Sequence, residues 1–349
     1  MDLGQTLRRV WRDLRAKLAG AGTRFPRASA PQTGEAGAPL RHEHRWGLWA
    51  RVALVVALLL VVVYPLDAWF TSHIDDDPDF GPPPVQLHQA GSRAVSAAIA
   101  LIDQEVNQRG WTANAPWFTP TALLDNMPNY QRGMIEALGR FAFELTDQIG
   151  RARGSSEADK DLQNAAGLLQ YPPDVWVWSP SVSIWPTATS QSQYRKAIKS
   201  LTAYNARLAA GQAVFDARAD NLQFTLSRMA ADLGSSSAVI QQHIRQTAGF
   251  PLETHTDDVF YTVKGQMYAY YIVLKGLQVD FAPIIKQRNL QEPWANMMES
   301  FRDAIALRPL VVLDGAPDSD FFPCTLCGEG FYLLRARTQL REITNILQQ

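Results

Sequence analysis

The hydrophobic positions of this 349-residue chain follow two different patterns. From Trp46 to Leu66 they form a continuous apolar run that holds one charge, Arg51. Beyond residue 85 they recur every three or four residues, which is the spacing of one face of an α-helix. The first pattern predicts a helix surrounded by lipid, and the second predicts helices that bury a stripe against one another.

The apolar run 46–66 is long enough to cross a bilayer. As a helix it extends about 31 Å, which matches the hydrocarbon thickness of a membrane. Trp46, Trp49, Tyr64 and Trp69 bracket it as an interfacial aromatic belt does. A cleaved signal peptide is the alternative, but its basic region would be some fifty residues long and no small-residue cleavage motif follows the run. We therefore expect an uncleaved signal anchor.

The periodic part predicts an all-α fold. Ser155 or Ser156 is expected to cap one short helix through Leu168, and Gly234 is expected to end a longer one. Residues 308–315 are the one stretch that reads as an extended strand or loop. The remaining helical stripes cover residues 95–106, 134–149, 194–208, 222–233, 260–281, 294–305 and 333–347.

The clearest stripe, from Phe260 to Phe281, alternates steps of three and four over three heptads, and Pro283 is expected to end it. A strict 3.5-residue repeat keeps one seam against a partner helix, which predicts coiled-coil-like packing. We therefore expect an up-and-down helical bundle. The same seam could instead pair between chains and build a homo-oligomer.

Charge divides the chain at the apolar run. Residues 1–51 carry ten Lys/Arg and four acids, whereas residues 68–349 carry 23 and 29. Basic residues close to a span stay in the cytoplasm, so the C-terminal part is predicted to be periplasmic and the protein to reside in a bacterial inner membrane. The expected parts are a cytoplasmic basic segment with a short amphipathic helix and a disordered linker (1–45), a transmembrane signal anchor (46–66), an acidic Pro-rich spacer (67–84) and a periplasmic helical domain (85–349).

The spacer is expected to be stiff and hydrated, because its prolines favour an extended conformation. Asp75, Asp77 and Asp79 have the spacing of a calcium loop. However, Gly81 comes one place late and Gln86 stands where such a loop needs a glutamate. A solvated linker is the better interpretation.

The segment 171–186 contains three tryptophans and four prolines and cannot form a helix. Trp176, Trp178 and Trp185 are the candidate binding residues of the chain. Either the indoles clamp this loop onto the bundle, or they form an exposed platform for a glycan, a lipid or a protein.

Cys324 and Cys327 are the two cysteines of the chain, and in an oxidising compartment they would form a local disulfide at the start of the last helix. The C-x-x-C pair also resembles half of a zinc knuckle, but zinc needs four ligands. His243 and His255 do not complete finger spacing. Two chains could pool their cysteines, whereas a thioredoxin-like role lacks its βαβ context. We expect no metal and no cofactor.

Catalysis has little support, because no nucleophile-elbow, metalloprotease or phosphate-loop motif occurs. Glu136, Glu144 and Asp147 share one predicted helix and could include the paired carboxylates of a glycosidase, although such residues are usually solvated. The segment 255–258 could hold a histidine base and an orienting acid, or simply an acidic helix start. No basic-aromatic pattern points to nucleic acid.

Three segments, 123–133, 176–180 and 260–270, resemble a family of uncharacterised bacterial inner-membrane proteins, catalogued as domain of unknown function 2333. The resemblance covers roughly residues 45–349, implies a Gram-negative envelope location and brings no active site. The expected function is an interaction or scaffolding module of the cell envelope, with the bilayer and an unknown envelope protein or glycan as partners. The alternative is an envelope enzyme acting on peptidoglycan or lipid through carboxylates in a cleft.

Overall fold

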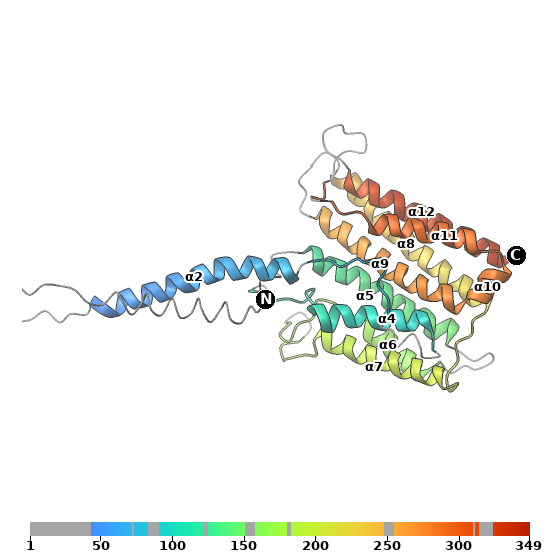
Figure 1. Ribbon diagram of the computed structural model, residues 1–349, viewed down its shortest axis with the longest axis horizontal. Coiled ribbons are helices and arrows are strands. Elements are labelled where there is room, and N and C mark those ends of the chain that lie inside the picture. The colour runs from blue at the N-terminus through green and yellow to red at the C-terminus, as the bar shows by residue number, and fades with distance from the viewer. Residues whose placement is uncertain are drawn as a thin grey trace, which may run out of the picture. The chain divides into compact units, whose positions relative to one another are not determined.

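A computed structural model of the chain (Figure 1) describes residues 43–71, 73–82, 91–116, 118–119, 121, 125–150, 158–179, 183–247, 255–309, 311–313 and 324–349. Within these ranges the regular structure is helical, so the predicted all-α class is confirmed. The expected amphipathic helix at 3–18 and the linker at 19–40 lie outside the described residues. Helix α2 and the bundle that follows are described separately.

Helix α2 (Glu43–Thr71) contains the apolar run. Its window Trp49–Leu66 is apolar enough and long enough to cross a membrane, and none of that window is buried against the rest of the protein. Pro65 lies inside the helix, near the end of the window. The window Trp49–Leu66 therefore contributes nothing to the core of the bundle.

The bundle consists of helices that alternate in direction, as the up-and-down prediction requires (Figure 1). Ser92, before α4, binds Asn205 of α7 and Asp280 of α9, and these contacts mark one end of the bundle. At the opposite end Trp111 binds Pro173, which follows α6. We call these the Asp280 end and the Trp111 end.

The helices are α4 (Arg93–Asp103) with the π-helix η1 (Gln104–Gly110), α5 (Asn126–Glu144) with the π-helix η3 (Leu145–Ile149), α6 (Lys160–Leu169), α7 (Ser190–Ala209), α8 (Ala219–Thr247), α9 (Thr256–Asp280), α10 (Ala282–Gln287), α11 (Gln291–Ile305) and α12 (Thr325–Gln348).

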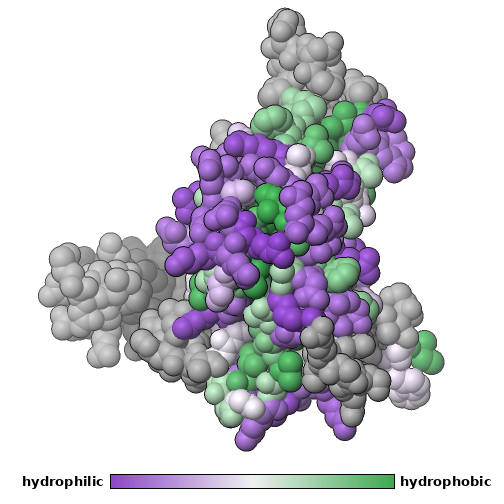
Figure 2. All heavy atoms as spheres, turned by 90° about the vertical axis from the view of Figure 1, so that its right-hand side faces the viewer, coloured by the Kyte–Doolittle hydropathy of each residue, from purple (hydrophilic) through white to green (hydrophobic). Residues whose placement is uncertain are grey.

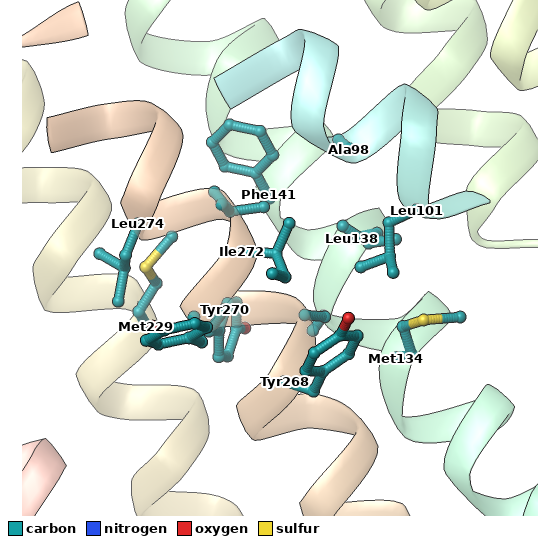
Figure 3. Close-up of a cluster of buried hydrophobic side chains, with 14 of the residues drawn as sticks. Ala98, Leu101, Met134, Leu138, Phe141, Met229, Tyr268, Tyr270, Ile272 and Leu274 are labelled. Carbon is teal, nitrogen blue, oxygen red and sulfur yellow. The ribbon is translucent and has the colours of Figure 1, made fainter. Parts of the chain in front are cut away.

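Helix α9 lies at the centre of the bundle. It packs against α4, α5, α8, α11 and α12, and Figure 3 shows its Tyr268, Tyr270, Ile272 and Leu274 among side chains of α4, α5 and α8. Residues 267–274 are all buried, so α9 is covered on every side rather than along one seam. The heptad positions between Phe260 and Phe281 are filled inside one chain and are not free to pair with a second copy.

Two glycines let α5 and α9 approach each other closely. A Cβ on Gly133 would overlap the carbonyl oxygen of Thr262, and a Cβ on Gly265 would overlap that of Tyr130. Because backbone atoms cannot move aside as a flexible side chain can, this crossing requires glycine at both positions. The resulting contact holds the two helices backbone against backbone.

Three predicted boundaries differ from the structure. Asp159, rather than Ser155 or Ser156, caps α6 through the N–H groups of the first turn. Helix α8 continues through Gly234 to Thr247, and the guanidinium of Arg337 lies beside this glycine, where a larger side chain would have no room. Helix α9 ends at Asp280, and Pro283 stands in the first turn of α10. The described part of 308–315 is loop.

Candidate functional site

The tryptophan-rich loop at the Trp111 end is fastened through its backbone. The indole of Trp111 donates to the carbonyl of Pro173 (2.8 Å), and Asn114 donates to that of Val175 (2.6 Å). Ser190, at the start of α7, accepts from the N–H of Val175 (3.1 Å) and donates to the carbonyl of Pro172 (2.8 Å). The loop is therefore positioned by buried polar contacts of α7 and of the segment after η1.

The three predicted binding residues have different surroundings. The ring of Trp176 is half-buried and meets Phe118 edge to face, with 6.1 Å between ring centres. Trp178 and Trp185 are 66% and 74% exposed, and the adjacent Ile184 is 87% exposed. Trp178 and Trp185 therefore do not clamp the loop onto the bundle. The hydrogen bonds of Trp111, Asn114 and Ser190 hold the loop instead.

The acidic segment after α2 is not the hydrated spacer that the sequence suggested. Asp76 is 2% exposed, and its carboxylate binds Lys264 of α9 (2.7 Å) and Arg308, which follows α11. Asp75 binds Arg109 of η1. Asp75, Asp77 and Asp79, which have the spacing of a calcium loop, contact different groups: Arg109, the N–H of Asp79 and Arg302, respectively.

The same segment continues along α9 through its backbone. The hydroxyl of Tyr268 donates to the carbonyl of Asp77 (3.0 Å), and the ammonium of Lys275 donates to the carbonyls of Pro78 (2.7 Å) and Phe80 (3.2 Å). Partners on α9 therefore hold the stretch 76–80 against the bundle.

Lys264 and Glu329 bring charge-bearing groups into the core beneath this segment. Lys264 is 3% exposed and also donates to the carbonyl of Leu307 (2.5 Å). Burial lowers the pKa of Lys264, and the nearby Asp76 carboxylate opposes that shift. Burial raises the pKa of Glu329 well above its usual range, with only Lys264 acting against it. Burial thus favours the neutral form of Glu329, whose neighbour Lys264 is bound to Asp76.

A second buried carboxyl group lies close by on η1. Glu105 accepts from the side-chain amide of Gln131 (3.0 Å), and the oxygen of the same amide accepts from the N–H of Thr112 (2.8 Å). Burial raises the pKa of Glu105 to about 7, against the opposing effects of Gln131 and Arg109. This carboxyl group therefore changes charge near neutral pH.

One surface pocket of about 280 Å³ contains two carboxylates on its wall, and it lies between α5, α6 and α8. Glu144 accepts from Arg228 (3.0 Å), and Asp232 accepts from Arg140 (2.6 Å) and from the hydroxyl of Tyr270 (2.6 Å). Burial raises the pKa of Glu144, and Arg228 opposes this. Each carboxylate is thus already paired with an arginine. Neither is therefore free to act as a general acid or base.

The other predicted candidates do not join this pocket or one another. Asp147 lines an adjacent pocket with Phe143. Burial raises the pKa of Glu136, which lies on α5 outside both pockets. The ring of His255 lies 3.1 Å from Asp258 at the start of α9, and His243 contacts Thr256 (3.0 Å).

Cys324 and Cys327 are joined as a disulfide at the start of α12, with 5.2 Å between their Cα atoms. The sulfur of Cys324 also accepts from the N–H of Cys327 (3.1 Å), so this residue acts as the N-cap of the helix. Within the described ranges no group of three or more His, Cys, Asp and Glu side chains converges as a metal site would require.

Comparison with known proteins gives one result. The model of the family DUF2333, described as "Uncharacterized protein conserved in bacteria", matches residues 43–250 and 252–349. The chain belongs to the DUF2333 family. Neither a curated protein nor a solved structure matches this DUF2333 chain. The predicted membership of this uncharacterised bacterial family is therefore confirmed.

The buried charges of this DUF2333 protein were not predicted from the sequence, although their positions within the apolar helical stripes indicate burial. Lys264 lies four residues after Phe260 and three before Met267, within the apolar stripe. Glu329 lies three residues after Leu326 and four before Leu333. A charged residue at a core position of a helix needs a partner of opposite charge. For Lys264, this requirement predicts a buried acidic residue, which in the structure is Asp76.

Proposed function

We propose that this protein is anchored in a bacterial inner membrane by α2, with its N-terminus in the cytoplasm and its helical bundle in the periplasm. In this proposal the bundle works by binding, as an interaction module of the cell envelope, rather than by catalysis. The Trp178–Trp185 loop is its binding surface.

The anchor is supported by the contrast between composition and burial. An apolar helix in water normally buries its side chains, because exposed apolar area costs about 25 cal/mol per Å². The window Trp49–Leu66 buries none of its side chains, whereas the bundle completes its core without them. A membrane provides the missing apolar surroundings, and the basic residues of 1–51 favour a cytoplasmic N-terminus.

The observation that carries the binding role is the exposure of Trp178 and Trp185 on a fixed loop. Exposed indoles are unfavourable in water, and tryptophan is enriched where proteins bind partners. Asn114, Trp111 and Ser190 hold the described arms of the loop, residues 171–179 and 183–186, without a partner. Binding through a preformed loop avoids the entropy cost of ordering it.

The pocket between α5, α6 and α8 gives less support to an enzyme. Glycoside hydrolysis needs one carboxylic acid and one free carboxylate facing the same bond. Glu144 and Asp232 are each bound by an arginine, and Arg140 and Arg228 occupy the space in front of them. The pocket resembles a surface ion-pair network more than an acid–base site.

Two experiments test the proposal. Alkaline phosphatase fused after Gln349 should be active in cells, and green fluorescent protein at the same place should stay dark; the reverse pattern would reject the topology. A photo-crosslinking amino acid at position 185 should form adducts in intact cells, whereas the same residue at Val279, exposed on α9 at the Asp280 end, should form few. Equal labelling at the two positions would reject the loop as the binding surface.

A further inference from the structure

The exposed apolar side chains of the tryptophan loop gather at its tip. The N–H of Thr187 donates to the carbonyl of Val177 (3.0 Å), and that of Ser183 donates to the carbonyl of Ser179 (3.0 Å). These bonds hold the two arms of the loop together. They therefore bring Trp178 on one arm close to Ile184 and Trp185 on the other, and we call these three residues the tip patch.

The tip patch lies beside the point where the chain arrives from α2. The carbonyl of His73 accepts from Arg109 (2.8 Å), two residues before Trp111, whose indole binds Pro173 in the loop. In addition, the hydroxyl of Tyr64 lies 3.5 Å from the carbonyl of Phe118, whose ring contacts Trp176. The loop and the exit of the apolar helix are therefore close neighbours.

The chain between the apolar window and this point is short. Leu66 and His73 are seven positions apart in the sequence, and a chain of seven residues spans at most about 25 Å in any conformation. If α2 crosses a bilayer, as proposed above, the Trp111 end cannot move farther than this from the membrane surface. The tip patch is thereby held permanently at a high effective concentration of lipid.

The chemistry of the tip patch fits the interfacial layer of a membrane. Indole rings prefer the headgroup region, where the apolar ring contacts acyl chains and the N–H group stays hydrated. Ile184, which precedes Trp185 and is 87% exposed, adds a purely apolar side chain. The Asp280 end differs: Figure 2 looks onto the side of the bundle that carries α10 and the C-terminus, and the residues coloured there are mainly hydrophilic.

We propose that Trp178, Ile184 and Trp185 insert into the interfacial layer of the same bilayer that α2 crosses. The partner of the tip patch is therefore the phospholipid surface rather than a protein or a glycan. This inference rests on the proposed membrane anchor and adds a second membrane contact. Together the two contacts orient the bundle with its Trp111 end toward the lipid.

The test uses the full chain in vesicles of phosphatidylethanolamine and phosphatidylglycerol. An Ile184→Cys variant carries an environment-sensitive fluorophore, and Val279→Cys, exposed at the Asp280 end, is the matched control. With nitroxide-labelled lipids we expect position 184 to lose most of its emission and position 279 to keep its own. Equal, weak quenching at both positions would overturn the proposal.

Two additions separate this proposal from the anchor on which it rests. Vesicle flotation tests α2: protein that fails to float rejects the anchor, whereas floating protein with a water-exposed label at 184 rejects only the lipid contact. Adding Trp178→Ser and Trp185→Ser to the labelled variant should relieve the quenching without changing the melting temperature. A label that is shielded in native membranes but not in pure lipid would mean a protein partner and would also reject the proposal.

Discussion

Helices α2 and α9 are similar in length and both are rich in apolar side chains, yet their surroundings are opposite. The window Trp49–Leu66 of α2 buries no residue in the protein, whereas residues 267–274 of α9 are all buried. The difference lies in what accompanies the apolar residues. The window Trp49–Leu66 of α2 consists mainly of valine, leucine and alanine, whereas α9 mixes glycine, tyrosine, glutamine and lysine with its aliphatic residues.

The comparison shows that apolar content alone does not make a helix part of a protein core. A core helix must fit its neighbours in shape and must provide partners for every polar atom that it buries. In α9, Gly265 supplies the close approach, while Lys264 and Tyr270 find their partners in Asp76 and Asp232. A helix in lipid meets a fluid solvent and needs neither device.

Removing the buried cation of α9 should have the largest effect. Lys264→Met leaves the Asp76 carboxylate buried with only Arg308, and loss of one partner from a buried ion pair costs about 3–5 kcal/mol. Chemical denaturation of the full chain in detergent measures this loss. The control Arg308→Met removes a side chain that is 70% exposed, and it should cost about 1 kcal/mol or less. Similar losses in both variants would contradict the assignment of Lys264 as the essential partner.

A matched pair of leucine truncations tests the comparison directly. Leu274→Ala in α9 removes a fully buried side chain and should cost about 2–5 kcal/mol in the unfolding free energy of the bundle. Leu58→Ala in α2, where the side chain is 63% exposed, should leave that free energy unchanged. The same denaturation measurement serves for both. A destabilised Leu58→Ala bundle would mean that α2 packs against the protein.

A glycine pair tests the importance of shape. Gly265→Ala forces a methyl group against the carbonyl of Tyr130 and should cost about 1–3 kcal/mol. Gly167→Ala in α6 has no atom within 4 Å of the added carbon and should stabilise by about 0.5–1 kcal/mol. Thermal unfolding followed by circular dichroism distinguishes the two signs. If both changes stabilise, the α5–α9 crossing is looser than described.

The last expected effect depends on pH. Because Glu105 holds its proton up to about pH 7 in the fold but only to about 4.5 when unfolded, its contribution to stability should fall as pH rises between these values and level off above them. Glu105→Gln should remove this contribution to the slope and stabilise the protein at pH 8 by about 1–3 kcal/mol. Denaturation at several pH values measures the slope. Glu299→Gln, on the exposed face of α11, should keep the wild-type slope, and an unchanged slope in Glu105→Gln would contradict the assignment to Glu105.

The helices were predictable because their stripes follow directly from burial on one side. The all-round burial of α9 was not, since a heptad pattern shows only which positions are apolar and not how many neighbours cover the helix. The role of Asp76 was missed because its partners are distant in sequence and an acidic, proline-rich stretch has the composition of a solvated linker. Trp178 and Trp185 were predicted as candidates, but their exposure depends on hydrogen bonds of Ser190 and Asn114 that no local pattern reveals.

The position of Asp76 also has a consequence for biosynthesis. This residue is among the first to emerge beyond the apolar helix, but its partner Arg308 is synthesised 232 residues later. A nascent chain therefore lacks the buried partner of Asp76 until Lys264 has been synthesised, and its second partner until Arg308 has been synthesised. Products truncated before residue 264 would lack the partners on α9 that hold the stretch 76–80, and this stretch would then be accessible to proteases.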